Sequence, residues 1–244
     1  METPKAFQLP FVRKEQVSKD AYAFYFDRTK EEFNFLPGQY IRITLPQEHP
    51  DERGIRRFFS VTTSPLDKQY IGITTRIIQS SFKKTLANLS PGTPVEFFGP
   101  VGRFIFDPQE SQPHILLAGG IGITPFHSML LYAIEKNLSI PITLFVSFST
   151  AEDVLFKNEL DEATKNNPNI KLIYTVTKPE ESKVPWNGEK GRISEDLIKK
   201  YITDFSTAIF YIVGPPPMVS FMEEMVKQMG IPIERIRKET FVGY

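Results

Sequence analysis

The 244-residue sequence contains no cysteine and only three histidines, at positions 49, 114 and 127. The absence of cysteine excludes disulfides, thiolate zinc sites and cysteine-held iron–sulfur clusters. The histidines have no ligand-like spacing, so we expect no metal site. Charge of one sign is not in excess, because 29 basic residues balance 29 acidic ones. We therefore expect no nucleic acid and no anionic membrane surface as a partner.

A long uninterrupted hydrophobic run is missing too. The first 16 residues lack the apolar core of a signal peptide, and the most apolar stretch, residues 115–134, is broken by glycines and a proline. We expect a cytoplasmic, monomeric protein with no membrane span. At 41% hydrophobic residues, the chain can bury the core of one large or two modest domains.

The first part of the chain is β-rich. Aromatic and β-branched residues alternate with polar ones, and proline or glycine separates these runs, which is typical of short antiparallel strands. This pattern predicts a small antiparallel β-barrel over residues 7–106. The predicted strands cover residues 21–26, 40–45, 58–63, 70–75 and 95–98, with one helix over 81–89.

Residues 107–112 are the predicted linker, after which strands alternate with helices. Such alternation indicates an α/β fold whose parallel sheet has helices on both faces. We therefore predict a barrel domain over residues 1–110 and an α/β domain over residues 111–244. The strands are expected at 115–118, 142–148, 170–176, 208–213 and within 235–244, the helices at 124–136, from 151 or 152 to 165, 194–201 and 218–229, and a polar loop at 178–191.

A glycine-rich turn, Gly119 to Gly122, follows the first strand of the α/β part. Glycine permits positive φ and close approach of a bound group, Thr124 can cap the next helix, and Pro125 suits its first turn. Free N–H groups at a helix start favour a phosphate. A purely structural turn remains the alternative, because Pro125 stands where the G-x-G-x-x-G fingerprint has its third glycine. A second marked turn, residues 214–218, follows the strand at 208–213.

Five ordered motifs resemble those of the ferredoxin–NADP reductase superfamily, particularly its stand-alone flavin reductase members. The barrel motifs are Leu36-Pro-Gly-Gln-Tyr40, Arg57-Phe-Phe-Ser-Val-Thr-Thr-Ser-Pro65 and Gly99-Pro-Val-Gly-Arg-Phe104; the α/β motifs are Ala118-Gly-Gly-Ile-Gly-Ile-Thr-Pro125 and Gly214-Pro-Pro-Pro-Met218.

For the barrel, the resemblance implies an FAD site. Arg57 would contact the diphosphate, Phe59 would stack on the isoalloxazine in place of the usual tyrosine, and Ser60 would hydrogen-bond the N5 edge. From the residues alone, Arg57 is a solvated charge and Phe59 with Ser60 an ordinary in-out strand pair. Gln79 replaces a family glycine, which weakens the expected phosphate contact at the following helix start. The remaining FAD residues implied are Phe58, Thr74, Arg76, Ser80, Ser81 and Phe82.

For the α/β part, the resemblance implies an NAD(P)H site. Val213 departs from the cysteine that many relatives have near the hydride path. Near the C-terminus, Phe241 is the expected ring over the flavin, with Tyr244 as its rival, and Glu239 is a possible relay beside Ser60. The alternative is a plain C-terminal strand. The implied NAD(P)H residues are Gly119, Gly120, Gly122, Thr124, Pro125, Gly214, Pro215 and Met218.

The choice between NADH and NADPH rests on the segment Ser147-Phe-Ser-Thr150, which has no basic residue and is followed by Asp153. An NADP 2′-phosphate generally requires an arginine there, so we favour NADH, although Lys178 or Lys183 can supply charge.

The leading hypothesis is an FAD-dependent oxidoreductase that takes hydride from NAD(P)H and passes electrons to another protein, such as ferredoxin, flavodoxin or an oxygenase component, or to a small-molecule acceptor. Two alternatives stay open: a reductase that treats flavin as a diffusible substrate, and an electron-transfer subunit that works only within a complex.

Overall fold

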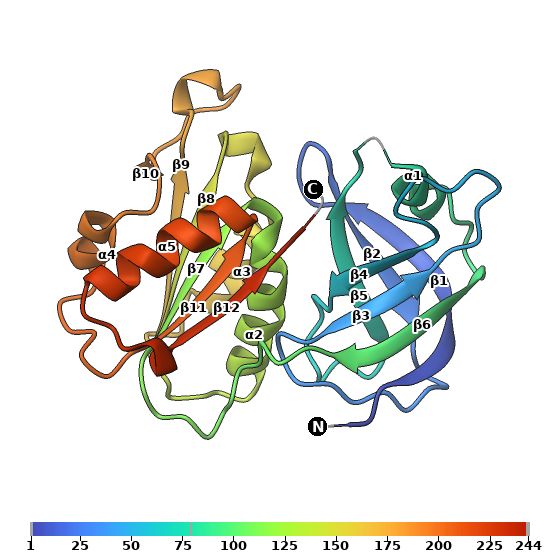
Figure 1. The fold of residues 1–244 in the computed structure, drawn as a ribbon, viewed down its shortest axis with the longest axis horizontal. Helices are drawn as coiled ribbons and strands as arrows, with labels where there is room; N and C mark the ends of the chain where they lie inside the picture. Colours follow the sequence, from blue (N-terminus) through green and yellow to red (C-terminus); the bar gives the residue numbers. More distant parts are fainter. Residues whose placement is uncertain (1, 79, 243–244) are drawn as a thin grey trace. The chain divides into compact units, whose positions relative to one another are not determined.

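The computed structural model describes residues 2–78 and 80–242 and contains two six-stranded sheets, the first antiparallel and the second parallel with helices (Figure 1). This arrangement confirms the predicted fold class. By their contacts, the residues up to Phe106 group with Thr124–Glu135 into one unit, and Asp107–Ile123 groups with the residues from Lys136 onward into a second unit.

The first unit is a barrel-like antiparallel sheet with strand order β4-β3-β6-β1-β2-β5. An isolated bridge between Val61 and Ile73 links its two outer strands. Its core is rich in phenylalanine, and rings such as Phe7 and Phe97 stack with centroids 5.5 Å apart. The elements are β1 (Lys5–Gln16), β2 (Ala21–Asp27), β3 (Tyr40–Thr44), β4 (Arg56–Ser60), β5 (Tyr70–Arg76), α1 (Ser81–Ala87) and β6 (Pro94–Val101).

Strand β1 was not among the predicted strands. Its apolar residues Phe7, Leu9 and Phe11 alternate with exposed ones, which is the ordinary signal of a half-buried strand. Pro10 lies within this run and argues against a central strand. The structure nevertheless pairs β1 with both β2 and β6, with Pro10 opposite Pro94 at the end of the β6 pairing.

The second unit is a parallel sheet with strand order β10-β9-β8-β7-β11-β12. Its central strands are fully buried apolar runs, as expected of parallel strands covered on both faces. The strands are β7 (His114–Gly119), β8 (Ile142–Phe148), β9 (Ile170–Val176), β10 (Glu189–Lys190), β11 (Ile209–Gly214) and β12 (Ile236–Thr240); the α-helices other than α2 (Ile123–Glu135) are α3 (Lys157–Thr164), α4 (Glu195–Tyr201) and α5 (Pro216–Gln228), and the short 3-10 helices are Gly120–Gly122, Ala151–Asp153, Pro179–Glu181 and Ile233–Arg235.

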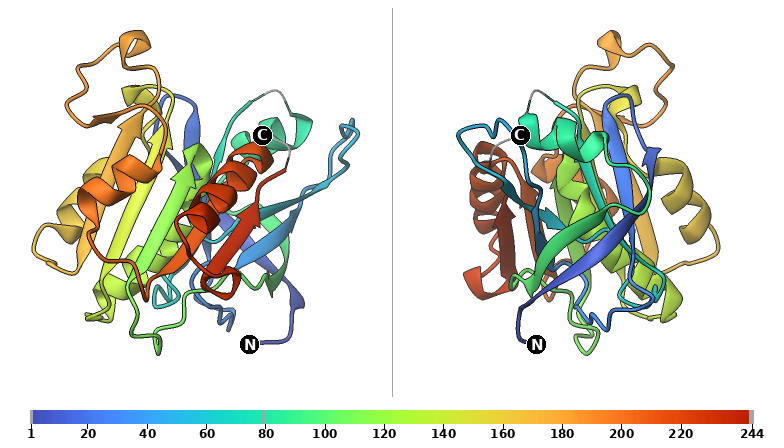
Figure 2. Two further views of the ribbon diagram at one scale, coloured as in Figure 1. Left: turned by 60° about the vertical axis from the view of Figure 1, so that its left-hand side comes forward. Right: turned by 90° about the vertical axis from the view of Figure 1, so that its right-hand side faces the viewer.

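Helices cover both faces of this sheet, as predicted. Helices α4 and α5 pack with Ile173 of β9 in one apolar cluster. The neighbouring side chain, Tyr174, points to the opposite face, where Lys157 of α3 lies 4.8 Å from its ring centroid. In the right-hand view of Figure 2, α5 and α3 accordingly lie on opposite sides of the sheet.

Three predictions of local structure were wrong. The helix expected from 151 or 152 to 165 is split, because Asp153 caps a short 3-10 turn with Thr150 and Phe156 adopts a left-handed φ of 57° before α3 begins. The expected polar loop at 178–191 contains the two-residue strand β10. Helix α2 begins at Ile123, so Thr124 lies inside its first turn and is not its cap.

Helix α2 hydrogen-bonds the chain segment that directly follows β4. The His127 Nδ1 atom lies 2.8 Å from the Thr62 carbonyl oxygen, and because a carbonyl only accepts, Nδ1 is the donor. The Ser128 hydroxyl donates to the Thr63 carbonyl oxygen at 2.7 Å, and Ser64 donates to Glu135. Three side chains of one helix thus fix three consecutive residues of the barrel.

Candidate functional site

Arg57 lies in β4 and is buried, with 5% of its surface exposed. Its Nη1 atom donates to the carbonyl oxygens of Arg53, Gly54 and Arg56, each at 2.8 Å, and its Nη2 atom donates to the Asp51 carboxylate. This guanidinium holds the pKa of Asp51 below its usual range. Arg57 is therefore not the solvated charge that the sequence alone suggests.

Several cations gather around helix α1. The Lys83 ammonium is buried, and its burial, together with the charges of Arg53, Arg57 and Arg76, lowers its pKa to about 8. The Asp20 carboxylate, which lies 3.6 Å from the Arg76 guanidinium, acts in the opposite direction and raises this pKa. The excess of positive charge fits an anion such as a diphosphate. Lys83 belongs to the helix start, residues 80–83, that the resemblance assigns to a phosphate contact.

Two hydroxyls of the barrel are buried without a partner. Ser60 and Thr74 are 6% and 4% exposed, and within residues 2–78 and 80–242 neither Oγ of Ser60 nor Oγ1 of Thr74 has a hydrogen-bond partner. Buried hydroxyls normally have partners, so unpartnered ones mark places where a bound group can supply them. Both residues were predicted to contact FAD, and a polar flavin edge fits this need.

The aromatic residues of β4 point to opposite sides. The Phe59 ring lies 5.9 Å from that of Phe82 in α1 and packs against the barrel core. Phe58 is 61% exposed, and its ring meets Tyr40 edge-on at 5.5 Å. The in-out alternation of the strand is thus present, and it puts Phe59 and Phe82, both predicted FAD contacts, side by side.

The predicted phosphate contact at the start of α1 is engaged within the chain. Ser80 caps the helix, and its hydroxyl accepts from the Lys83 amide at 3.4 Å and donates to Asp51 at 3.1 Å. The Ser81 hydroxyl accepts from the Asp51 amide at 2.9 Å. Gln79, the departure from the family glycine, lies outside the described residues.

In the second unit, the structure brings the two predicted nucleotide turns together. A Cβ added to Gly119 would overlap the sulfur of Met218, and one added to Gly122 would lie 2.7 Å from the Val213 carbonyl oxygen. Gly120 adopts a positive φ of 52°. Gly120 is therefore required by backbone conformation, and Gly119 and Gly122 by close approach.

Strand β12 and the residue that follows it place Glu239 and Phe241 beside these turns. Glu239 pairs in register with Val213, and the Phe241 amide donates to the Gly214 carbonyl oxygen at 2.9 Å. Burial raises the pKa of Glu239 to about 7, and its Oε2 atom has no hydrogen-bond partner in the part of the chain that is described. Tyr244, the predicted rival of Phe241, lies outside the described residues.

Thr124 and Pro125 follow the first turn within helix α2. Thr124 is 2% exposed and is the second residue of the helix, so the prediction that it caps the helix was wrong. Pro125 is the third residue and does occupy the first turn, where its missing N–H has no intrahelical partner. Pro215 directly precedes α5, and Pro216 begins it.

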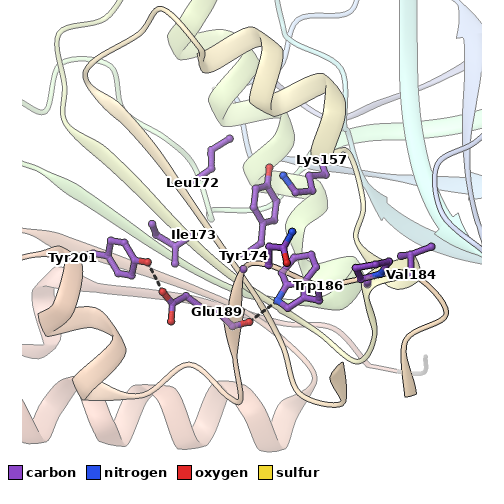
Figure 3. A pocket seen from close by; sticks show the side chains of 12 residues that line it. Lys157, Leu172, Ile173, Tyr174, Val184, Trp186, Glu189 and Tyr201 are labelled. Atoms are coloured by element: carbon purple, nitrogen blue, oxygen red, sulfur yellow. Dashed lines mark hydrogen bonds between the residues drawn. The ribbon is translucent and has the colours of Figure 1, made fainter. Parts of the chain in front are cut away.

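A cavity of about 600 Å³ lies elsewhere, along β9 (Figure 3). Two of its polar side chains hydrogen-bond Glu189: the Trp186 indole donates to the Glu189 carbonyl oxygen at 2.7 Å, and the Tyr201 hydroxyl donates to the Glu189 carboxylate at 2.5 Å. None of the predicted site residues lines it. The cavity is thus distinct from both predicted cofactor sites.

Across residues 2–78 and 80–242, no group of three or more histidine, aspartate or glutamate side chains is arranged to hold a metal ion. In the same residues, no helix is both long and apolar enough to cross a membrane.

Comparison with known proteins places both units. The chain is 24% identical over 211 residues to the glycine betaine monooxygenase reductase subunit of Chromohalobacter salexigens, an alignment that covers 86% of this chain and 56% of that protein. The chain thus spans little more than half the length of this relative.

Two solved structures share its fold, both at 19% identity. The cytochrome P450 reductase GcoB of Amycolatopsis has a TM-score of 0.85 (99% of this chain, 71% of that one), and the flavohem-like FAD/NAD binding domain of nitric oxide dioxygenase from Vibrio cholerae has 0.83 (96% and 98%).

The family matches follow the order of the two units. Residues 8–106 match the oxidoreductase FAD-binding domain, and residues 116–224 match the oxidoreductase NAD-binding domain. The first match contains the buried cations and unpartnered hydroxyls of the barrel, and the second contains both glycine turns. The chain is thus built from an oxidoreductase FAD-binding domain followed by an oxidoreductase NAD-binding domain, on a fold that it shares with ferredoxin–NADP reductase.

Proposed function

We propose that the chain is an FAD-dependent oxidoreductase that takes electrons from NAD(P)H and passes them to a separate acceptor. When bound, FAD supplies the redox chemistry by accepting hydride at N5 and releasing electrons to the acceptor. Residues 1–110 hold FAD in this proposal, and residues 111–244 hold NAD(P)H. The observation that carries it is the pair of buried, unpartnered hydroxyls of Ser60 and Thr74 in the unit that also contains the cationic cluster around Lys83.

In the barrel, the proposed roles follow from the chemistry of each side chain. Ser60 and Thr74 hydrogen-bond the polar edge of the flavin, and Phe59 supplies an apolar face. Arg57, Arg76 and Lys83 provide positive charge for the diphosphate. The other residues proposed to contact FAD are Phe58, Ser80, Ser81, Phe82, Phe241 and Tyr244.

In the second unit, the backbone binds the dinucleotide. Gly119 and Gly122 let this turn pack closely against Met218 and the Val213 carbonyl, Gly120 adopts a positive φ, and the backbone N–H groups of the turn are proposed to bind the pyrophosphate. Glu239, which burial keeps protonated up to a pH of about 7, is proposed to hold a proton at its Oε2 atom. Gly214, Pro215 and Met218 complete the proposed site in this unit, and Thr124 and Pro125, which group with the first unit, are also proposed to contact NAD(P)H.

We propose that NADH is preferred over NADPH. The loop after β8 has no basic side chain between Ser147 and Thr150. The nearby Asp153 carboxylate accepts hydrogen bonds from the Thr150 amide and hydroxyl, each at 3.0 Å, which holds an acidic side chain at this loop. A 2′-phosphate would be repelled there.

For the acceptor, we propose a second protein, with an oxygenase component as the first candidate, because two of the similar proteins are named as reductases of a monooxygenase and of a cytochrome P450. A monomer acting in the cytoplasm is part of the same proposal. A small-molecule acceptor is the second possibility and needs no docking surface.

The decisive experiment is anaerobic reduction of the purified, FAD-loaded protein. The flavin absorbance should bleach on adding NADH, and more slowly on adding NADPH. Absence of bleaching with both nucleotides would contradict the proposal, and faster bleaching with NADPH would contradict the preference for NADH.

A second candidate function is reduction of a diffusible flavin, and one observation favours it. The Arg57 guanidinium already donates to three carbonyl oxygens and a carboxylate of its own chain, which leaves it poorly available to FAD. Gel filtration of FAD-loaded protein at micromolar concentration separates the two functions. Release of the flavin supports the diffusible substrate, and co-elution supports the bound cofactor.

A further inference from the structure

The loop between β3 and β4 carries Asp51, whose carboxylate contacts two residues proposed to hold the flavin diphosphate. One oxygen accepts a hydrogen bond from the Arg57 guanidinium, and the other accepts from the Ser80 hydroxyl at 3.1 Å. The Asp51 amide in turn donates to Ser81 at 2.9 Å. A single negatively charged side chain thus links β4 to the start of α1.

The chain itself occupies both Nη atoms of Arg57. Its Nη1 atom is engaged with three carbonyl oxygens, its Nη2 atom with Asp51, and 5% of the residue is exposed. The remaining Nε atom is buried and has no hydrogen-bond partner within the described residues. A phosphate can therefore bind at Nε, but it then lies beside the Asp51 carboxylate, which accepts a hydrogen bond from Nη2 of the same guanidinium.

We propose that Asp51 is an internal counter-ion that competes with the flavin diphosphate for Arg57 and Ser80, and so sets how tightly FAD is held. This inference rests on the proposed function, in which the barrel binds FAD. Carboxylate and phosphate oxygens both accept charge-assisted hydrogen bonds from a guanidinium, so either can satisfy Arg57. Both are negatively charged, so they repel each other at close range.

The surrounding charges agree with an exchange of one anion for another. Lys83, Arg53 and Arg76 accompany Arg57, and the burial of Lys83, together with repulsion by the three arginines, lowers its pKa. In the flavin-free protein, Asp51 relieves part of this repulsion. The flavin diphosphate would relieve more of it, because it carries more negative charge than one carboxylate.

If Asp51 competes with the diphosphate, removing its charge should change the affinity for FAD and the stability of the flavin-free protein in opposite directions. Removing the charge of Asp51 should strengthen FAD binding, because the diphosphate no longer displaces a carboxylate. The same change should destabilise the flavin-free protein, because a buried guanidinium loses its counter-ion. A residue that merely orients Arg57 for the phosphate would instead weaken FAD binding when it is changed.

The test uses the full chain with Asp51→Asn, and Asp51→Ser as a second variant if the first folds poorly. Asp67→Asn is the matched control, because this substitution removes the same charge from a barrel loop. The Asp67 carboxylate accepts hydrogen bonds from two backbone amides, at 2.8 and 3.0 Å. Fluorescence titration measures the dissociation constants of FAD and of riboflavin, which has no phosphate. Thermal unfolding measures the flavin-free proteins.

For Asp51→Asn we expect an FAD dissociation constant about tenfold below that of the natural protein, an unchanged riboflavin dissociation constant and a lower Tm without flavin. Asp67→Asn should leave the FAD dissociation constant unchanged. Unchanged or weaker FAD binding by both Asp51 variants would overturn the competition. If neither the natural protein nor any variant binds FAD, the proposed function itself fails, and that result is distinguishable from FAD binding that Asp51 does not affect.

Discussion

In the barrel, the residues predicted to hold a cofactor carry charges and hydroxyls, whereas in the second unit they are mostly glycines. The Arg57 guanidinium is engaged by the chain's own carbonyl and carboxylate oxygens. The turn at Gly119 and Gly122 depends on close packing, since a Cβ there would strike Met218 or the Val213 carbonyl. A charged site has to exchange partners when a ligand binds, whereas a glycine turn has to keep its backbone conformation. We therefore expect the barrel to respond to charge and pH, and the turns to respond to the size of the residue.

The largest expected effect is on the turns. Gly120→Val places a β-branched residue at a φ of 52°, and it should weaken NADH binding about 100-fold while FAD binding stays unchanged. Equilibrium titration with each cofactor measures both. Gly230→Val is the control, because Gly230 has a φ of 85° with no atom within 4 Å of an added Cβ. Loss of FAD binding by Gly120→Val would show that this stretch does not serve the nucleotide.

Next in size is the stability contribution of Glu239, the one strongly shifted acid beside the turns. Its folded pKa of about 7 exceeds its ordinary value of 4.5, so protonation stabilises the fold, and this contribution is lost as the pH rises through 7. Glu239→Gln should therefore raise the free energy of unfolding at pH 8 by roughly 1–3 kcal/mol and change it little at pH 5. Urea unfolding at both pH values measures this. An equal gain at both would contradict the pKa assignment.

A smaller effect should distinguish the barrel by its response to pH. Lys83 loses its proton above a pH of about 8, and the barrel then loses one positive charge. FAD binding should accordingly weaken about tenfold between pH 7 and pH 9.5, and Lys83→Met should remove most of this dependence. NADH binding by the second unit should not follow the same curve. FAD titrations that are flat with pH in the natural protein would exclude Lys83 as a charge for the diphosphate.

Without flavin, the stability of the protein should change with pH in the direction opposite to that of FAD binding. Because the folded pKa of Lys83 lies below its ordinary value of 10.5, the unfolded chain binds more protons between pH 8 and 10.5, and the contribution of Lys83 to stability rises with pH over that range. As the pH increases, the free energy of unfolding of the flavin-free protein should therefore rise, whereas the affinity for FAD should fall.

The smallest expected effect is that of alanine at the two closely packed glycines, one of which faces a flexible side chain and the other the backbone. Gly119→Ala meets the flexible end of Met218, so NADH binding should weaken only about threefold, and Met218→Ala should restore most of it in the double variant. Gly122→Ala meets the backbone carbonyl of Val213 at 2.7 Å and should not be rescued by Met218→Ala. Equal rescue of both would mean that the turn repacks as a whole.

Much of the fold was predictable, because parallel strands are long apolar runs bounded by turn residues. The strands at Ile142–Phe148 and Ile170–Val176 match their predicted bounds. Strand β1 was missed because Pro10 obscured a clear alternation, and the split before α3 depends on the left-handed Phe156, which no propensity indicates.

The site was predictable in part, and the roles of its residues remain predictions. The two glycine turns were found from their pattern, because a missing Cβ is visible in a sequence. The Asp51–Arg57 pair was not, because it depends on how the intervening loop folds back onto β4. The unpartnered state of Ser60 and Thr74 was equally hidden, since it is a property of everything packed around them.

The bonds from α2 to residues 62–64 affect how this protein can be dissected. A fragment ending at residue 110 would keep the Thr62 and Thr63 carbonyls but lose His127 and Ser128, which are bonded to them. If the barrel were exchanged for that of a relative, helix α2 would have to be exchanged as well, although it follows the predicted linker in the sequence. Chimeras and truncations of this chain should therefore be designed around contacts, with α2 treated as part of the barrel.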